Sequence, residues 1–412
     1  MVSITRDFAP PFKLIAPFFI IGVIFYLISS FLLFFFDVEQ LSSTASLHVI
    51  SWVHIFLLGF VMMTIFGAMA QLIPVVLEHG HFSVDFYYII WPLLTLGIMC
   101  MSYGFIYNHL ILSFGGMIVL IAMSIFSIET FLTIKDVKEY SLVVVSMLIS
   151  NIFLITGITI GFIMALTFAG FISTNVIMLL KAHVYMLIGG YVLITIMGFS
   201  YILIPMFGLA HGFSSKPLKL AIWLQSIGVV LVFVSSLIES HFLIKIGYFC
   251  TLISLLSYFY LIYTINKTRA KKENDMYIVS LLISFVFFAI GLVFGVQHVV
   301  TSNEMYAVLS GWLIFVGFFG FMILGHLYKI VPFLVWYERF SPLVGKQKVP
   351  MLGDMVPKKS ANFQIYLTAI GIVLFSVAIF FQNSTLQIVG ASSLSIGAII
   401  LFFNLIFMIR FK

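Results

Sequence analysis

The chain has 412 residues, of which 63% are hydrophobic and only 8% are charged. Soluble globular domains are typically about 25% charged, so this composition excludes an ordinary soluble protein and indicates an integral membrane protein. The formal net charge of +6 at pH 7 does not indicate nucleic acid binding, because the basic residues fall in short loops between apolar runs.

Twelve apolar runs, each long enough to cross a bilayer, follow one another along the chain. They predict an all-α membrane protein rather than a β-barrel. In chain order the predicted spans lie near 12–36, 47–77, 84–108, 110–134, 140–167, 176–209, 217–238, 242–265, 276–300, 305–336, 363–382 and 385–409. The second, sixth and tenth are unusually long, so we expect these helices to tilt or to extend beyond the bilayer.

The distribution of Lys and Arg predicts the orientation of the spans. With the N-terminus inside, all 20 Lys and Arg residues except Lys181 and Lys245 fall on the cytoplasmic side. We therefore expect a multi-pass protein of a bacterial cytoplasmic (inner) membrane with both termini in the cytoplasm. The basic, proline-containing segment 337–362 is expected to form a cytoplasmic loop.

The three long spans share a pattern. They read "HIFLLGFVMMTIFGAMAQLIP" up to Pro74, "HVYMLIGGYVLITIMGFSYILIP" up to Pro205 and "WLIFVGFFGFMILGHLYKIVP" up to Pro332. The period of four spans predicts a single polytopic domain built from three four-helix units, near 1–138, 139–272 and 273–412. The alternative is a chance recurrence of glycine, phenylalanine and a proline near the inner end.

This arrangement resembles subunit I of the heme–copper oxidase and nitric-oxide reductase superfamily. Where that family has H-P-E-V-Y-I-L-I in span six, this sequence has "KAHVYMLI"; where it has H-x-H and a glycine-rich exit in span ten, this sequence has "SGWLIFVGFFGFMILGHLYKIVP". The family's low-spin heme histidine in span two corresponds best to His54. The resemblance implies twelve helices in three pseudo-threefold arcs around the cofactor sites.

The departures from the family are as informative as the matches. Ser310 and Trp312 stand in place of the two span-ten histidines, Lys181 in place of the first copper histidine, and His183 in place of the neighbouring glutamate. The span-seven stretch "PLKLAIWLQSIGVVLVF" contains no histidine. An oxygen-reducing centre needs several imidazoles on copper opposite a histidine-ligated heme. The chain is therefore not expected to be a conventional terminal oxidase, and no catalytic residue is assigned.

Four histidines are the candidate cofactor ligands. His54 and His183 lie 20 and 22 residues before their prolines, and His298 ends span nine on the same predicted outer side. These three are candidates for a b-type heme or, alternatively, for a copper ion; His326, towards the inside, is a candidate heme ligand or proton-path group. The alternative for each histidine is a polar contact between helices, and the alternative for the whole chain is that it has no cofactor.

Other polar residues in or beside the spans are weaker candidates. Lys181 is expected to extend to the headgroups, Tyr185 to bond a cofactor or to pack, and Lys329 to form an interfacial pair with His326. Glu129 is expected at the inner membrane interface, the alternative being a part in a proton relay. The loop "EHGHFSVD" (78–85) could bind a divalent ion or be solvated.

Two classes of function remain open at this point. The first is a divergent heme–copper-oxidase-like protein with one heme b or copper ion, serving electron transfer or the handling of nitric oxide, heme or copper, with respiratory-chain subunits or a small redox protein as partners. The second is a cofactor-free transporter or channel for a small anion or protons, with His183, Lys181 and His326 along its path. A non-catalytic assembly partner of a respiratory complex is a third possibility.

Overall fold

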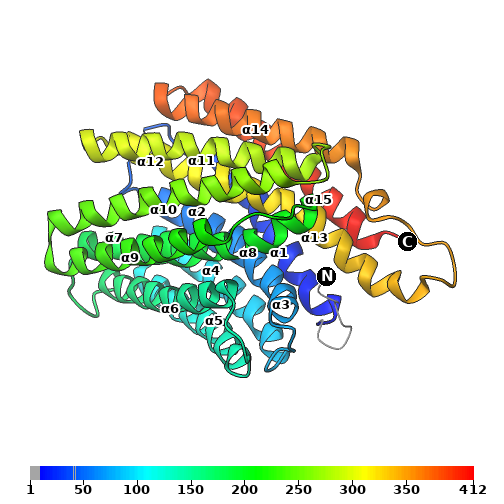
Figure 1. The fold of residues 1–412 in the computed structure, drawn as a ribbon. Helices are drawn as coiled ribbons and strands as arrows, with labels where there is room; N and C mark the ends of the chain where they lie inside the picture. Colours follow the sequence, from blue (N-terminus) through cyan, green and yellow to red (C-terminus); the bar gives the residue numbers. More distant parts are fainter. Residues whose placement is uncertain (1–9, 40, 42) are drawn as a thin grey trace. The chain divides into compact units, whose positions relative to one another are not determined.

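The computed structural model describes residues 10–39, 41 and 43–412. The described chain is almost entirely helical, and twelve of its helical segments are long and apolar enough to cross a membrane (Figure 1). The predicted all-α class and the twelve spans are confirmed, so this is a multi-pass helical membrane protein. The second, sixth and tenth segments have 31, 33 and 36 residues, as their long apolar runs predict.

The helices follow the predicted spans to within a few residues at each end. In chain order they are α1 (Phe12–Leu32) with η1 (Leu33–Phe35); α2 (Leu47–His54), η3 (Ile55–Met62) and α3 (Met63–Leu77); α4 (Asp85–Ile106); α5 (His109–Lys135); α6 (Leu142–Phe168); α7 (Val176–Val184), η4 (Tyr185–Val192) and α8 (Leu193–Gly208); α9 (Lys216–Ile238); α10 (His241–Thr268); α11 (Met276–Thr301); α12 (Glu304–Trp312), η5 (Leu313–Gly320) and α13 (Phe321–Arg339); α14 (Lys358–Phe381); and α15 (Ser384–Arg410).

Side-chain caps explain many of the helix starts. In each capped helix a side-chain oxygen of the residue before the first turn accepts a hydrogen bond from a backbone N–H that has no partner within the helix. The capping residues are Asn108, Ser141, Asn175, Ser240, Asp275, Asn303 and Asn383. Such residues are also where apolar runs break in the sequence, which is why the span limits were predictable.

Each long span contains one stretch of π-helix, and the three stretches are equivalent in length and place. They are η3, η4 and η5, each with eight residues, and each ends twelve or thirteen residues before Pro74, Pro205 or Pro332. π-Helix is rare and is found mostly as short bulges within α-helices, frequently at functional sites. Its recurrence in three helices is a structural counterpart of the repeat seen in the sequence.

The described chain divides into two compact units, each of six spans. One comprises Leu72–Gly104 and Asn108–Glu273; the other comprises Pro10–Gln71, Phe105–Tyr107 and Asn274–Lys412. In the first unit α5 packs on α6, and in the second α15 packs on α1. α5 and α15 are each the fourth span of a predicted four-helix unit, and α6 and α1 are each the first span of one. In both contacts, therefore, the fourth span of one predicted four-helix unit packs on the first span of another.

Glycines bring each long helix close to the helix before it. Gly59 packs on Phe25, Gly190 on Phe153 and Gly317 on Phe287; eight residues later, Gly67 packs on Phe18, Gly198 on Ser146 and Gly325 on Ser280. A Cβ atom on Gly190 would lie 2.7 Å from the Cβ of Phe153, and one on Gly317 would lie 2.6 Å from the Cβ of Phe287. Only glycine permits this approach, so the same packing recurs with the period of the prolines.

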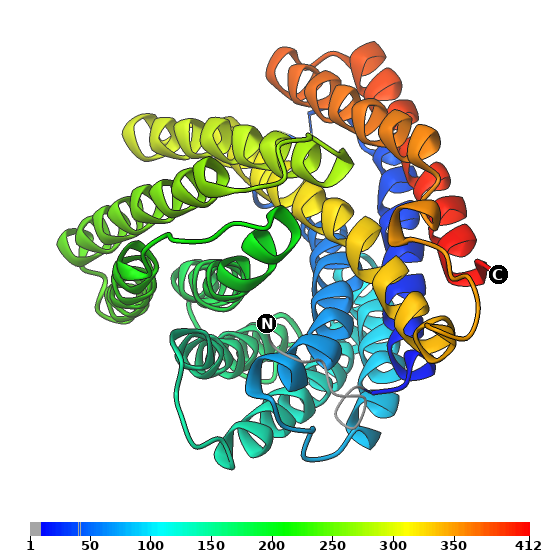
Figure 2. The same ribbon diagram turned by 45° about the vertical axis from the view of Figure 1, so that its right-hand side comes forward.

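Glycines also join the last two helices of each predicted four-helix unit. In each pair one glycine faces the carbonyl oxygen of another: Gly97 and Gly115 in α4 and α5, Gly228 and Gly247 in α9 and α10, and Gly390 and Gly371 in α15 and α14. A Cβ atom on Gly228 would lie 2.8 Å from the carbonyl oxygen of Gly247. The α9–α10 and α14–α15 pairs can be followed side by side in both ribbon views (Figures 1 and 2).

The segment between α13 and α14 is folded against the helix ends. Short 3₁₀ turns form at Ser341–Leu343 and Leu352–Asp354. The indole N–H of Trp336 donates to the carbonyl oxygen of Pro350 at 2.8 Å, and the side chain of Met355 is completely buried. This loop is anchored by hydrogen bonds and apolar contacts.

Candidate functional site

His54 is the last residue of α2 and stands directly before the π segment η3. Its Nδ1–H donates to the carbonyl oxygen of Ile50 at 2.8 Å, and its ring lies 4.9 Å from that of Phe105, which belongs to the same compact unit. The hydrogen bond places the proton on Nδ1, so Nε2 carries the lone pair. A backbone or carboxylate acceptor on the second nitrogen is the usual environment of a metal-bound histidine.

His183 stands two residues before the π segment η4 and lies across α6. Its Nδ1–H donates to the carbonyl oxygen of Gly157 at 2.9 Å. The ring fills the space beside Gly161, where a Cβ atom would lie 2.6 Å from the imidazole Cε1 and 3.6 Å from Nε2. The interhelical contact weighed from the sequence is therefore present, and it selects the same tautomer as in His54.

His298 and His326 have different surroundings from these two. The Nδ1–H of His298 donates to the carbonyl oxygen of Asn303 at 2.9 Å, where it closes the turn after α11. The Nδ1–H of His326 donates to the carbonyl oxygen of Met322 at 2.7 Å, and its Nε2 accepts from the hydroxyl of Tyr277 at 3.3 Å. Both ring nitrogens of His326 are therefore engaged by protein atoms.

Ser310 and Trp312, in the third long span, are held by packing contacts. The ring of Trp312 stacks on Phe375 at 4.4 Å and lies 5.7 Å from Trp52. Its indole N–H donates to the carbonyl oxygen of Ile372 at 3.3 Å. Ser310 lies against Gly295. The third long helix therefore carries aromatic packing at Trp312, which lies 20 residues before Pro332 as His54 lies 20 residues before Pro74.

Lys181 and Tyr185 lie on the same helix as His183 but meet other groups. Lys181 is exposed and lines a shallow cleft of about 190 Å³ together with Asn175, Glu239 and His241. The hydroxyl of Tyr185 donates to Thr251 at 3.1 Å, and its ring lies 5.5 Å from that of Tyr248. Lys181 thus lines an open cleft, whereas Tyr185 packs on α10.

Lys329 pairs with an aspartate rather than with His326. Its Nζ lies 2.8 Å from Oδ2 of Asp275 and 5.7 Å from the centre of the Tyr277 ring. Both charged side chains are 25% exposed. The carboxylate also caps α11 by accepting from the backbone N–H of Ile278.

Asp275→Asn is expected to lower the free energy of unfolding by about 1 kcal/mol, the upper end of the range for exposed ion pairs. Asparagine keeps an oxygen for the helix cap, so the change reports on the charge of the ion pair with Lys329. Thermal unfolding of the purified protein measures it. Asp136→Asn, at the exposed end of α5, is the control and should stay within about 0.5 kcal/mol of the wild type.

No group of three or more His, Cys, Asp and Glu side chains that could hold a metal ion occurs among the residues that the structure describes. The proposed metal set of His54, His183 and His298 is divided between the two compact units, with His183 in one and the other two in the second. Each histidine is therefore assessed in its own surroundings.

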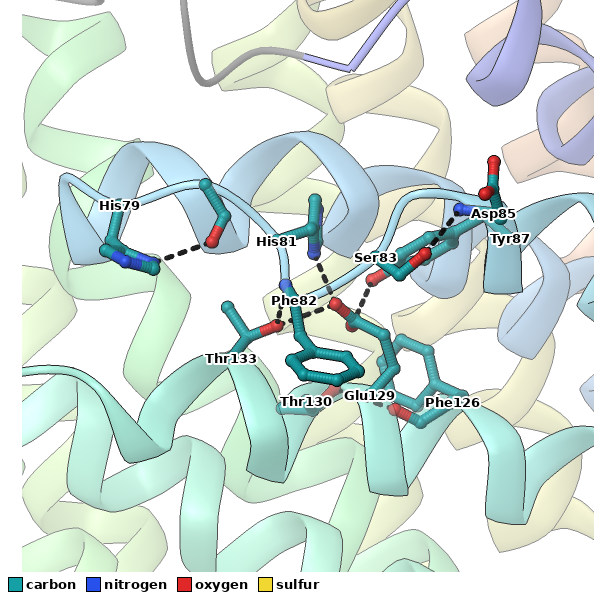
Figure 3. A network of polar contacts seen from close by, with 11 residues as sticks. His79, His81, Phe82, Ser83, Asp85, Tyr87, Phe126, Glu129, Thr130 and Thr133 are labelled. Carbon is teal, nitrogen blue, oxygen red and sulfur yellow. Dashed lines mark hydrogen bonds and ion pairs between the residues drawn. The ribbon is translucent and has the colours of Figure 1, made fainter.

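A cluster that the sequence did not single out as a site lies in the first unit, around the carboxylate of Glu129. Figure 3 shows side chains from α5 and from the loop between α3 and α4 converging on this carboxylate. Oε1 accepts from Thr133 at 2.6 Å and from Nδ1 of His81 at 2.9 Å, and Oε2 accepts from the hydroxyl of Tyr87 at 3.1 Å. We call His81, Tyr87, Glu129 and Thr133 the inner polar cluster.

The inner polar cluster is enclosed by protein. The side chains of His81 and Glu129 are 0% exposed, and Tyr87 and Thr133 are also buried. Glu129 is therefore shielded by the loop rather than solvated at the membrane interface. The sequence signal was a lone glutamate within an apolar run, with a threonine one turn later; His81, 48 residues away, gave no local sign of the contact.

No known protein family matches this chain, and no curated protein matches it.

Proposed function

We propose that this protein is a membrane-embedded redox protein with an architecture like that of heme–copper oxidase subunit I, in which His54 and His183 are each a candidate ligand of a b-type heme or a copper ion. The observation that carries the proposal is their similar setting. His54 stands directly before η3 and His183 stands two residues before η4, and each donates Nδ1–H to a backbone carbonyl.

The residues present fit such a group on two counts. The tautomer of both histidines leaves Nε2 as the ligating nitrogen, and the glycines of η3 and η4 let helices approach closely around each site. His298 is a weaker third candidate because it closes a helix end. A bound heme or copper would supply one-electron transfer, while the chain positions the imidazoles and limits the access of water.

Three features support the architectural part of the proposal. The π segments, the long-helix glycines and the glycine pairs of the following helices all recur with the period of the three predicted units. The contacts of α5 with α6 and of α15 with α1 repeat the same neighbour relation. In the third predicted four-helix unit, Trp312 packs against other aromatic rings. We therefore infer that the cofactor ligands come from the first two predicted four-helix units, and that oxygen reduction is not the activity.

The experiment is a visible absorption spectrum of the detergent-purified protein, oxidised and dithionite-reduced, with metal analysis of the same sample. We expect a Soret band with a reduced α-band of the b type, or stoichiometric copper. A colourless, metal-free protein, expressed with ample heme and copper, would contradict the redox proposal.

A cofactor-free transporter of protons or small anions is the second candidate function. It is favoured by the buried Glu129, because ionisable groups enclosed within membrane helices commonly mark ion or proton pathways. The absorption spectrum separates the two functions, since a transporter of this kind should carry neither heme nor copper. The role of a non-catalytic assembly partner in a respiratory complex would also give a colourless protein.

A further inference from the structure

A cleft opens between α7, α9 and α10, at the predicted outer end of the first compact unit. Its volume is about 190 Å³. Two oppositely charged side chains line it, Lys181 of α7 and Glu239 of the turn between α9 and α10. Neither residue takes part in the proposed redox function.

The two lysines that fall on the predicted outer side both lie at this cleft. Lys181 lines it directly. Lys245 follows Ile244, which lines the cleft, and lies one turn after His241, which also lines it. All other Lys and Arg residues fall on the predicted cytoplasmic side. The positive charge of the predicted outer side is therefore gathered at one place.

The charged groups at the cleft are not engaged by other parts of the protein. Among the described residues, the side chains of Lys181, Glu239 and Lys245 form no ion pair and no hydrogen bond. A neutral group in the lining is already occupied, since the hydroxyl of Ser235 donates to the carbonyl oxygen of Ser240 at 2.7 Å. Lys181 and Glu239 thus face one cleft with opposite charges and remain unpaired, which suits a ligand that carries both charges.

The cleft lies at the level where helix ends meet lipid headgroups. Lys181 stands five residues after the first residue of α7 and Lys245 four residues after the first residue of α10, so both lie within about 8 Å of a helix end. Around them Ile177, Ile238 and Phe242 are 74%, 62% and 72% exposed. Exposed apolar groups beside a polar site are typical of a surface that contacts the membrane.

We propose that this cleft binds the headgroup of a phosphatidylethanolamine molecule from the adjacent leaflet. The phosphodiester accepts charge-assisted hydrogen bonds from the ammonium groups of Lys181 and Lys245, and the ammonium group of the lipid donates to the carboxylate of Glu239. The acyl chains lie along the exposed apolar side chains of the helix ends. The site does not depend on the proposed cofactor.

The test is native mass spectrometry of the full-length protein in detergent, with dioleoyl phosphatidylethanolamine, phosphatidylglycerol or phosphatidylcholine added in turn. We expect about fivefold more bound phosphatidylethanolamine than phosphatidylcholine at equal concentration, because the trimethylated ammonium has no N–H to donate to Glu239. Equal binding of these two lipids to the wild type would overturn the proposal, and this result does not depend on the folding of any variant.

A competition experiment distinguishes the lipid from a soluble phosphodiester. Glycerophosphoethanolamine has the same headgroup without acyl chains, so at the concentration of the lipid it should leave the bound phosphatidylethanolamine in place. Displacement of the lipid by this compound would show that the acyl chains contribute nothing, and it would overturn the assignment of a lipid ligand.

Substitutions separate the two charges of the headgroup. Lys181→Gln and Lys245→Gln should each lower the binding of phosphatidylethanolamine and of phosphatidylglycerol by up to about fivefold, since both lipids carry the phosphodiester. Glu239→Gln should remove the preference for phosphatidylethanolamine without weakening the binding of phosphatidylglycerol. Lys267→Gln, at the other end of α10, is the matched control and should bind lipid as the wild type does. Unchanged binding in the double lysine variant, or an unchanged preference in Glu239→Gln, would contradict the proposal.

Discussion

Replacing either His54 or His183 with alanine is expected to abolish the heme or copper signal of the purified protein. Each substitution removes an imidazole whose Nδ1–H is already committed to a backbone carbonyl, and water or a small side chain does not replace a lost histidine ligand in a closed apolar site. The measurement is the Soret absorbance per protein, or copper per protein, in each single variant and in the double variant.

Two exposed histidines provide the controls. His211→Ala, in the loop after α8, and His241→Ala, at the start of α10, should leave the cofactor content unchanged. The two candidate ligands are substituted separately because they lie in different compact units, and partial loss in one single variant would reveal a second site. Retention of the cofactor in the double variant would show that the assignment of ligands is wrong.

Gly190→Leu and Gly317→Leu are expected to prevent stable folding. A first side-chain carbon at these positions would lie 2.7 and 2.6 Å from the Cβ atoms of Phe153 and Phe287, which cannot move without moving α6 or α11. Overpacking of this kind costs 1–3 kcal/mol for extra methylenes and occasionally more, so we expect a loss of about 3 kcal/mol or more for a whole leucine side chain. Thermal unfolding and the fraction of monodisperse protein report it.

The matched control lies on the same long span as Gly317. Around Gly311 a Cβ atom would meet only the ring of Phe315, at 3.6 Å, so Gly311→Leu should fold nearly as well as the wild type. Equal stability of Gly317→Leu and Gly311→Leu would show that the contact between η5 and α11 is not tight in solution. The repeat would then lose its physical basis at that position.

The helices of this protein could be predicted because their limits are marked locally. Residues such as Asn108, Ser141 and Asn383 interrupt the apolar runs and also cap the helices. The lengths of the second, sixth and tenth spans followed from the same runs. A transmembrane helix requires about 20 consecutive, mostly apolar residues, and such runs can be read directly from the sequence.

The π segments could not be predicted in the same way. Residues 55–62, 185–192 and 313–320 are as apolar as the α-helical turns around them, and the change in hydrogen bonding depends on how the neighbouring helices pack. The prolines did indicate the repeat, but they align His54 with Tyr185 rather than with His183, since 74 − 54 and 205 − 185 are both 20. The two histidines therefore differ in register, and what they share is an Nδ1–H that donates to a backbone carbonyl.

The inner polar cluster shows a second limit of the sequence. Glu129 and Thr133 are one turn apart on a helix, which the sequence can show, but His81 and Tyr87 reach them only through the fold of the loop over α5. Short loops with several polar residues are usually solvated, so the expectation of a solvated loop or a divalent-ion site followed the common case. In this loop Glu78, His79 and Asp85 are exposed, as in the common case, but the side chain of His81 is buried against Glu129.

The π segments also affect how well the protein tolerates insertions and deletions. Removing a single residue from Ile55–Met62 would let the ladder return to ordinary α turns, whereas removing one from the α-helical turns between Met63 and Pro74 would rotate everything before it by about 100° relative to Pro74. His54 and the glycine contact at Gly59 would then point in new directions. We expect this protein to tolerate many substitutions in its lipid-facing residues. We expect it to tolerate hardly any insertion or deletion within the three long spans, because the number of residues in each span determines the direction in which its side chains point.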